Sequence, residues 1–458
     1  MTDRREVDVV VLGAGPAGEV IAGRLGERDL EVAIVEDRLV GGECSYWACM
    51  PSKALLRPAQ AVQEARRVPG AAQAVTGALD AAAVLARRDE VIHKLDDASQ
   101  MPWLEDRGIV LVRGRGHLAG ERTVHVGDTE LVARRAVVIA VGTEPMIPPV
   151  PGLAEARPWT NREATTSETL PGSLIVVGGG VVGVELGQAF ATLGVDVTLV
   201  ERAGRILERD EAFAADLVAD GLKASGVRVM CDVKMVSVER GADGRVTVET
   251  ETGGTLVADE ILVASGRRQV SDTLGLESIG LEAGSPPKPI EVGTDLRVAG
   301  HEWLYVVGDA NGRELLTHEG KYQARAAADV ICGRDVRIRD RMPPRVTFTE
   351  PQIAAVGHTL ESARAAGINA RAVEVPTQST AGASFHGKGS DGTSRFVVDE
   401  DKRVLVGATF VGSDVAEWLH AATIAVVAEV SLDDLWHAIP AFPTRSEVWL
   451  KLLEAYGL

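Results

Sequence analysis

The chain has 458 residues, 45% hydrophobic and 25% charged, a composition typical of a globular protein of roughly two to four domains. Its formal net charge of −18 argues against nucleic acid or an anionic membrane surface as the main partner. No apolar run reaches the roughly 18 residues of a membrane span, and the early glycine pattern argues against a signal peptide, so we expect a cytoplasmic protein without membrane insertion.

The first predicted element is a buried strand over residues 7–12, VDVVVL, followed by a glycine turn and a helix. The stretch GSLIVVGGGVVGVELG, residues 172–187, repeats this strand, turn and helix. Each copy has the G-x-G-x-x-G spacing, in which the glycines allow a tight turn, close approach to a pyrophosphate and close packing of helix on strand. The glycines are Gly13, Gly15 and Gly18 in the first copy, and Gly178, Gly180 and Gly183 in the second.

An acidic residue ends the next predicted strand in both copies. Glu36 and Glu201 each follow the first glycine of their fingerprint by 23 residues, where a carboxylate accepts hydrogen bonds from ribose hydroxyls. Two tight turns in unrelated α/β units are the alternative. We expect two dinucleotide sites, the first for FAD and the second for a nicotinamide. Glu201 would repel a 2′-phosphate and favours NADH, whereas Arg202 could accommodate that phosphate.

Two of the four cysteines, Cys44 and Cys49, lie close together in GGECSYWACMPSK, residues 41–53. In a reducing compartment such a pair indicates redox chemistry or metal binding, although two inert buried thiols are an alternative. Without a local histidine the pair does not complete a tetrahedral metal site, so we expect no metal. An ideal helix would hold the two Cα atoms roughly 7–8 Å apart, too far for a disulfide, so the segment must depart from regular helix. Pro51 contributes to that departure, and Lys53 follows Cys49 by one helical turn, where it favours a thiolate.

Five motifs in chain order resemble the class I pyridine nucleotide–disulfide oxidoreductases. The cysteine segment resembles the redox motif of this family, and four further stretches resemble its domain crossings, its second FAD contact and the start of its dimerisation domain. These stretches are VVIAVGTEPMIPPVPG at 137–152, ILVASGRR at 261–268, LYVVGDANG at 304–312 and RVTFTEPQIAAVG at 345–357.

The resemblance implies an α/β fold with two Rossmann-like dinucleotide-binding domains and a C-terminal α/β dimerisation domain. The FAD-binding domain would comprise residues 1–148 and 273–341, with the NAD(P)-binding domain, 149–272, inserted into it. Residues 342–458 would pair two chains as a homodimer.

The resemblance also implies roles for single residues. Cys49 would face the flavin, Cys44 would exchange with the substrate, and Lys53 would pair with Glu185 where hydride crosses from nicotinamide to flavin. Asp309 would bond a hydroxyl of FAD, although an ordinary turn aspartate is the alternative, and His318 would begin a helix against the flavin. The remaining cofactor-binding glycines expected from the motifs are Gly42, Gly142, Gly266 and Gly308.

The C-terminal segment departs from the family pattern. Disulfide reductases of this family carry a catalytic histidine in H-P-x-x-x-E, which moves a proton for thiol exchange. Here Pro443 and Glu447 are in place but the histidine position is Phe442, and His437 lies five residues upstream. Glu447 could keep an orienting or interface role, or be a plain helix-surface glutamate. The insert SYWA, 45–48, is also bulky, and its rings either face an aromatic acceptor or pack within the FAD domain.

Three hypotheses follow. The first is an NADH-dependent FAD oxidoreductase that passes electrons through a Cys44–Cys49 disulfide to a small non-lipoamide acceptor, namely a quinone, a metal ion or a small disulfide. The second is a dihydrolipoamide dehydrogenase with a relocated base, for which His437 is the candidate. The third is a flavin-binding sensor or assembly subunit without turnover. Phe442 favours the first, because phenylalanine cannot carry a proton.

Overall fold

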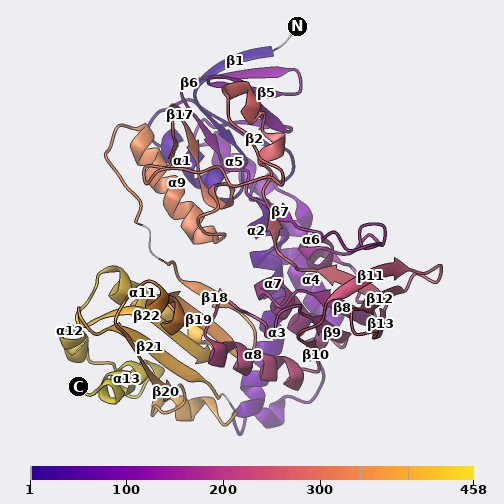
Figure 1. Ribbon diagram of the computed structural model, residues 1–458, viewed down its shortest axis with the longest axis vertical. Coiled ribbons are helices and arrows are strands. Elements are labelled where there is room, and N and C mark those ends of the chain that lie inside the picture. Colours follow the sequence, from indigo (N-terminus) through magenta and orange to yellow (C-terminus); the bar gives the residue numbers. More distant parts are fainter. Residues whose placement is uncertain (1–2, 340–341, 390) are drawn as a thin grey trace. The chain divides into compact units, whose positions relative to one another are not determined.

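The computed structural model describes residues 3–339, 342–389 and 391–458. The described chain divides into two compact units, which together include every helix and strand of Figure 1. Unit 1 comprises residues 3–51, 89–146 and 267–339, and unit 2 comprises the remaining segments of the described chain. Each unit holds one of the two glycine fingerprints.

Unit 1 is built on an eight-stranded sheet with the order β16-β17-β6-β1-β2-β3, and β4 and β5 form an antiparallel extension from β6. β1 lies between β2 and β6 and is parallel to both, with Val9 opposite Val32. This parallel centre with a reversal of strand order at β1 is the doubly wound arrangement that binds dinucleotides at its carboxyl edge. The strands are β1 (Asp3–Leu12), β2 (Val32–Glu36), β3 (Val110–Arg113), β4 (Gly116–Gly120), β5 (Thr123–Val126), β6 (Thr129–Ile139), β16 (Arg297–Val298) and β17 (His301–Val306).

The side chains of β1 alternate between two cores. Val9 and Val11 pack with helix α1 on one face, whereas Val10 and Leu12 pack into a second cluster on the other face. Both faces of a parallel sheet are covered, so its strands are apolar at successive positions, as the run at 7–12 indicated. α9 packs beside α1 on the first face (Figure 1).

The helices of unit 1 are short except for the two that cover the sheet. They are α1 (Pro16–Gly26), α2 (Gly42–Tyr46), α5 (Met101–Glu105) and α9 (Thr317–Ile331), while α3 (Cys49–Arg67) and α4 (Ala81–Val91) continue along the chain across the division between the units. A small antiparallel pair, β7 (Glu144–Pro145) with β15 (Arg267–Arg268), joins the two crossing segments within unit 1.

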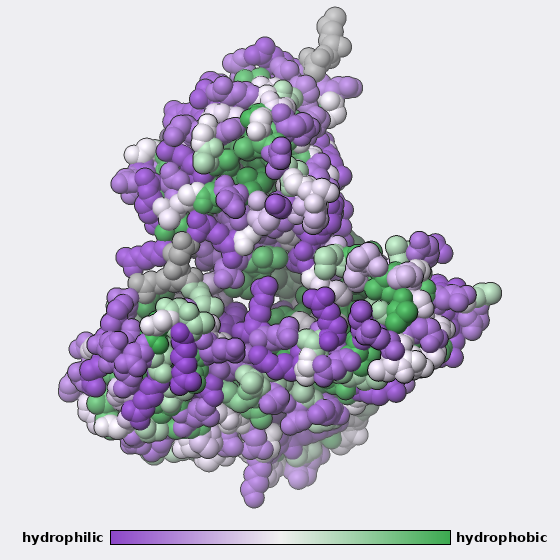
Figure 2. All heavy atoms as spheres, in the orientation of Figure 1, coloured by the Kyte–Doolittle hydropathy of each residue, from purple (hydrophilic) through white to green (hydrophobic). Residues whose placement is uncertain are grey.

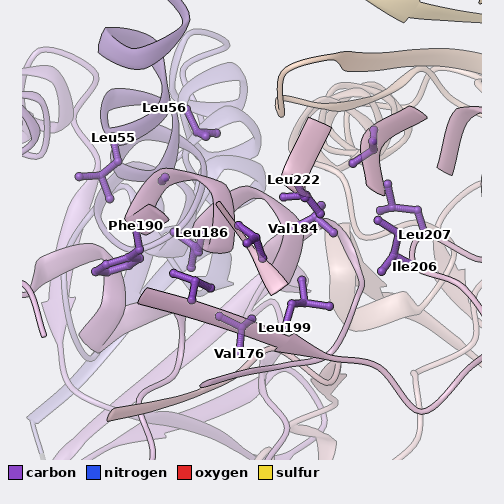
Figure 3. Close-up of a cluster of buried hydrophobic side chains, with 14 of the residues drawn as sticks. Leu55, Leu56, Val176, Val184, Leu186, Phe190, Leu199, Ile206, Leu207 and Leu222 are labelled. Carbon is purple, nitrogen blue, oxygen red and sulfur yellow. The ribbon is translucent and has the colours of Figure 1, made fainter. Parts of the chain in front are cut away.

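Unit 2 contains a four-stranded parallel sheet with the order β10-β9-β8-β14 and a three-stranded antiparallel sheet. Figure 3 shows the core over the four-stranded sheet, where side chains of α7 lie between strand residues and Leu55 and Leu56 of α3. The strands are β8 (Ser173–Val177), β9 (Asp196–Val200), β10 (Arg228–Met230) and β14 (Glu260–Val263), and then β11 (Met235–Arg240), β12 (Val246–Thr250) and β13 (Thr255–Ala258).

The C-terminal part of unit 2 is a five-stranded antiparallel sheet with the order β18-β19-β22-β21-β20. Its strands are β18 (Arg345–Thr347), β19 (Gln352–Gly357), β20 (Ala370–Pro376), β21 (Thr393–Asp399) and β22 (Val404–Gly412). The helices of unit 2 are α6 (Asn161–Thr166), α7 (Val181–Thr192), α8 (Ala212–Ala224), α10 (Leu360–Ala365), α11 (Leu419–Val427), α12 (Leu432–His437) and α13 (Val448–Tyr456).

The predicted fold class is confirmed, since two dinucleotide-type sheets with parallel centres and a C-terminal antiparallel sheet with helices are present. The predicted domain boundaries stay predictions; residues 52–88, expected in the FAD-binding domain, cluster with unit 2. Figure 2 shows hydrophilic residues over most of the visible face of each unit, with smaller apolar areas between them. Within the described residues, none of the helices combines the length and apolar character needed to cross a membrane.

Candidate functional site

The first fingerprint folds as a turn that only glycine permits. Gly13 has a φ of +97°, and a Cβ on it would lie 2.5 Å from the carbonyl oxygen of Ala140. A Cβ on Gly18 would lie 1.9 Å from the carbonyl oxygen of Gly13. Gly15, the N-cap of α1, is different, because its nearest neighbour would be the Cα of Gly42 at 4.0 Å. The backbone is therefore open at Gly15, at the N-terminus of a helix, where a pyrophosphate is bound in dinucleotide sites.

A buried carboxylate, that of Glu36, and a half-buried one, that of Asp309, flank this turn. Glu36 ends β2 and accepts hydrogen bonds from the backbone N–H groups of Ala14, at 2.8 Å, and Arg38, at 2.9 Å. Asp309 lies in the short turn after β17 and accepts a 2.9 Å hydrogen bond from the hydroxyl of Thr143. Burial raises the pKa of both carboxyl groups above the ordinary range. Acceptors that are anchored and partly desolvated suit neutral hydroxyl groups, such as those of a ribose or ribityl chain.

The open backbone at Gly15 together with these two acceptors fits FAD. Glu36 would hold the adenosine ribose, Asp309 a hydroxyl of the ribityl or ribose part, and the Gly13–Gly18 turn the pyrophosphate. The expected glycines Gly142 and Gly308 have φ values of +69° and +72°, so a side chain there would be strained.

Arg267 connects the second FAD contact with the redox segment inside unit 1. Its guanidinium donates to the hydroxyl and the carbonyl oxygen of Thr143, both at 2.6 Å, and lies 3.4 Å from the carboxylate of Glu43. Thr143 in turn donates to Asp309. Neither Arg267 nor Thr143 was among the predicted site residues, although both lie in the motifs that resemble the domain crossings. Their hydrogen bonding depends on tertiary proximity that the chain order does not reveal.

The redox segment departs from regular helix, as the cysteine spacing predicted. Cys44 lies in α2, which ends at Tyr46, and Cys49 begins α3 after a break at Trp47, whose φ is −131°. Pro51 falls in the first turn of α3, where no intrahelical N–H donor is needed. The structure assigns no disulfide bond between Cys44 and Cys49.

Thr317, the first residue of α9, contacts both sulfur atoms through its hydroxyl. Its hydroxyl donates to the Sγ of Cys44 at 3.2 Å and lies 3.5 Å from the Sγ of Cys49. The prediction named the next residue, His318, which is exposed on α9 within unit 1. A threonine beside a histidine at a helix start carries no distinctive sequence signal, so only the fold identifies Thr317.

The aromatic residues of the insert have different surroundings. Tyr46 is buried, and burial raises the pKa of its hydroxyl to about 12. Its ring lies 5.8 Å from that of Trp47, which is half-buried. Tyr46 therefore packs inside unit 1, as one of the two alternatives for these rings stated. The geometry of Trp47 alone does not assign it an acceptor.

The second fingerprint, in unit 2, repeats the first closely. A Cβ on Gly178 would lie 2.5 Å from the carbonyl oxygen of Ala264, and one on Gly183 would lie 1.9 Å from that of Gly178. At Gly180, the N-cap of α7, no atom would lie within 4 Å. Glu201 ends the next strand region and accepts from the backbone N–H groups of Gly179 at 2.6 Å and Ala203 at 2.8 Å. The residues present therefore fit a second dinucleotide. Gly266, which ends this segment of unit 2, has a φ of +122°.

Lys53 and Glu185 form the predicted ion pair within unit 2. The Nζ of Lys53 lies 2.6 Å from one carboxylate oxygen of Glu185, and the other oxygen accepts the backbone N–H of Phe348 at 2.9 Å. The ammonium also lies 4.8 Å from the centre of the Phe348 ring. Glu185 is buried and doubly hydrogen-bonded, so its charge is well compensated. The role of this pair beside a flavin stays a prediction.

The C-terminal motif lacks an acid–base group at its predicted position. The side chain of Phe442 is 78% exposed, and Ile439 nearby is 86% exposed. Glu447 accepts a 3.1 Å hydrogen bond from the backbone N–H of Gly382, so in this chain its carboxylate anchors a loop. His437 ends α12 and is exposed. Among the described residues, no group of three or more His, Cys, Asp or Glu side chains is arranged to hold a metal ion.

Comparisons with known proteins match most of the chain to one family and its dimerisation domain. Residues 7–328 match the family model "Pyridine nucleotide-disulphide oxidoreductase", and residues 343–453 match its dimerisation domain. The chain is 33% identical over 454 residues to a dihydrolipoyl dehydrogenase from Thermus scotoductus, covering 98% of this chain and 97% of the relative. It is 29% identical to a mercuric reductase from Staphylococcus aureus, covering 96% of this chain and 81% of the relative.

Two solved structures are similar over nearly the full length. One is the Cu(II) complex of the HOCl-induced flavoprotein disulfide reductase RclA from Escherichia coli, with a TM-score of 0.86 and 25% identity, covering 98% of this chain and 99% of that chain. The other is LpdA from Mycobacterium tuberculosis, with a TM-score of 0.86 and 26% identity, covering both chains completely.

Proposed function

The chain belongs to the pyridine nucleotide–disulphide oxidoreductase family, and from this premise we propose that it oxidises NADH and passes the electrons through FAD and the Cys44–Cys49 pair to a non-lipoamide acceptor. The observation that carries the proposal is the convergence of both sulfur atoms on the hydroxyl of Thr317, beside the FAD fingerprint in unit 1. Members of the family are flavoproteins, and the dimerisation domain supports a homodimer.

FAD, when bound, supplies the transfer of hydride equivalents from a pyridine nucleotide to the disulfide. The Gly13–Gly18 turn, Glu36 and Asp309 would hold it, and Cys49 would receive the electrons. Two electrons and one proton break the S–S bond, which leaves one thiolate and one thiol. Cys44 is the sulfur that meets the acceptor. A quinone would take both electrons, whereas Cu²⁺ takes one, so two Cu²⁺ ions would be reduced; the thiol proton is released to the acceptor or to water, and the disulfide forms again.

Phe442 supports an acceptor other than lipoamide. Reducing a small disulfide leaves a thiolate that must be protonated, and in disulfide reductases of this family a C-terminal histidine of the partner chain supplies that proton. An exposed phenylalanine cannot, and the carboxylate of Glu447 is already bonded to Gly382. A soft metal ion takes electrons without a proton, and a quinone that is reduced here would take its two protons from water. The names of two relatives point the same way, one a mercuric reductase and the other a structure with Cu(II).

The second candidate function is dihydrolipoamide dehydrogenase, and the 33% identity to the enzyme from Thermus scotoductus favours it. It requires another base, for which His437 is the candidate. The substitution His437→Ala would then abolish lipoamide turnover. An unchanged rate in this variant removes the second candidate.

An acceptor panel tests the proposal. We expect the purified flavoprotein to oxidise NADH with Cu²⁺ or a simple quinone, and to turn over lipoamide at least about a hundredfold more slowly than a family member with the histidine. The variant Cys49→Ser should lose the thiol-dependent rate, while Cys231→Ser, which removes a half-buried cysteine of unit 2, should retain it. A quinone rate that survives in Cys49→Ser would mean that this acceptor bypasses the thiols. Fast lipoamide turnover, or no NADH oxidation with any acceptor, contradicts the proposal; the latter result indicates the sensor hypothesis.

The preference for NADH is part of the proposal. The carboxylate of Glu201 is fixed by two backbone N–H groups at the end of β9, where it would accept ribose hydroxyls and repel a 2′-phosphate. We expect kcat/KM for NADH to exceed that for NADPH. The substitution Glu201→Ala should narrow this difference, and an unchanged ratio contradicts the assignment.

A further inference from the structure

The N-terminus of α9 meets both sulfur atoms through one side chain. Thr317 is the first residue of a 15-residue helix, and its hydroxyl lies 3.2 Å from the Sγ of Cys44 and 3.5 Å from that of Cys49. A hydroxyl has a single proton, so it donates to one sulfur at a time. The shorter distance and the donor direction belong to Cys44, the sulfur expected to meet the acceptor.

The surroundings of Cys44 include groups that raise the pKa of its thiol and groups that lower it. The adjacent Cys49 and burial raise the pKa of the Cys44 thiol, whereas the hydrogen bond from Thr317 and the positive charge of Lys321 act to lower that pKa. Lys321 lies one turn after Thr317 on α9, and the partial positive charge of the helix N-terminus adds to it. Glu43, next to Cys44 on α2, is paired with Arg267, which reduces its repulsion of a thiolate.

Resting on the proposed function, we propose that Thr317 is a catalytic hydrogen-bond donor that stabilises negative charge on the Cys44 sulfur, in a chain whose histidine position, Phe442, has no acid–base group. When electrons break the S–S bond, one sulfur is left as a thiolate and the other as a thiol. A donor that reaches both sulfurs stabilises the thiolate at either position without giving up its proton. This favours acceptors that take electrons alone over disulfides that need a proton for the leaving thiolate.

The test measures the reactivity of Cys44 without any acceptor. In the FAD-loaded Cys49→Ser background, the rate of iodoacetamide alkylation of Cys44 is followed against pH by peptide mass spectrometry, which separates it from Cys231 and Cys332. We expect Thr317→Val to move the midpoint of this profile to higher pH and to lower the rate near neutral pH about tenfold, because a hydrogen bond to a charged group is lost. The plateau rate at high pH should not change, since valine has nearly the shape of threonine.

Two matched variants sharpen the result. Thr317→Ser keeps a hydroxyl and should restore most of the wild-type profile, whereas Thr123→Val, at a half-buried position of β5 in unit 1, should leave it unchanged. A Thr317→Val profile that superimposes on that of the parent overturns the proposal. A change in the plateau alone, without a midpoint shift, shows altered access to Cys44 and also overturns it. If the midpoint shifts but the acceptor panel shows no turnover, the role of Thr317 stands and the proposed function fails.

Discussion

The two glycine fingerprints have almost the same backbone conformation. The helices that follow them carry carboxylates with different partners. In both, a Cβ on the third glycine would lie 1.9 Å from the carbonyl oxygen of the first, and a Cβ on the first would lie 2.5 Å from a carbonyl oxygen of a neighbouring strand end. In both, the acidic residue that ends the following strand region accepts two backbone N–H groups. These shared contacts explain why the repeat is detectable in the sequence.

The carboxylates that follow within the fingerprint helices differ in their partners. In α7, Glu185 is bonded to the ammonium of Lys53 and to a backbone N–H group. In α1, the carboxylate of Glu19 receives no hydrogen bond from the described part of the chain. Burial raises its pKa to about 7; the negative charge of Glu36 adds to this increase and the positive charge of Lys321 opposes it. The same turn therefore supports one ion-paired carboxylate and one whose pKa is raised to about 7. The glycine motif specifies the backbone but not the charge state of the helix that follows.

The largest effect on cofactor binding is expected from disrupting either of the two glycine turns. Gly18→Ala places a Cβ against the carbonyl of Gly13, and the backbone must move, so we expect FAD content to fall below about a tenth of the wild-type value. Gly183→Ala makes the equivalent change in unit 2 and should abolish NADH binding while FAD is retained. Absorbance after denaturation measures FAD, and fluorescence titration measures NADH. Gly77→Ala, with no atom within 4 Å, is the control. Normal FAD content in Gly18→Ala would show that the turn tolerates a Cβ at this position and would contradict this prediction.

The glycine turns and the acid residues could be predicted because each depends on local spacing. The break at Trp47 was also foreseeable, since the distance a disulfide allows is shorter than a regular helix gives. Thr317 and Arg267 were not predicted, because their roles depend on which strands the chain brings together. Arg267 lies in a recognisable motif and Thr317 lies next to a predicted site residue, but only the folded structure of unit 1 shows which hydroxyl or sulfur each contacts.

The next largest effect, on the stability of unit 2, is expected from removing Lys53, the partner of Glu185. Lys53→Met leaves a buried carboxylate without its cation, so we expect unit 2 to lose about 3–5 kcal/mol of unfolding free energy. The double variant Lys53→Met/Glu185→Leu removes both charges and should recover most of that loss. Thermal unfolding of the two variants measures the difference. Lys223→Met breaks an exposed pair with Asp220 and should change little. A Lys53→Met protein as stable as wild type would show that the pair is not needed for stability.

The unpartnered carboxylate of α1 should show the opposite behaviour. The pKa of Glu19 is raised from 4.5 to about 7, so the folded state holds its proton more tightly than the unfolded state between these values. Its contribution to stability is present below pH 4.5 and is lost as pH rises through about 7. We expect Glu19→Gln to stabilise the apoprotein by up to about 3 kcal/mol at pH 8 and not at pH 4.5, in urea unfolding. Equal effects at both pH values would exclude a raised pKa.

The smallest effect on nucleotide binding is expected at the residue that follows each of the two acids predicted to bind ribose. This is Asp37 in the first copy and Arg202 in the second, and both are exposed. Arg202→Asp makes the second site resemble the first. Because a single exposed charge contributes less than about 1 kcal/mol, we expect the KM for NADPH to rise by no more than about fivefold while that for NADH stays the same. Steady-state kinetics with the two nucleotides measures this ratio, and Arg209→Asp, another exposed arginine of the same segment, is the control. If NADH binding weakens instead, Arg202 contacts a part of the nucleotide that both forms share, and the difference between the two copies lies in affinity and not in selectivity.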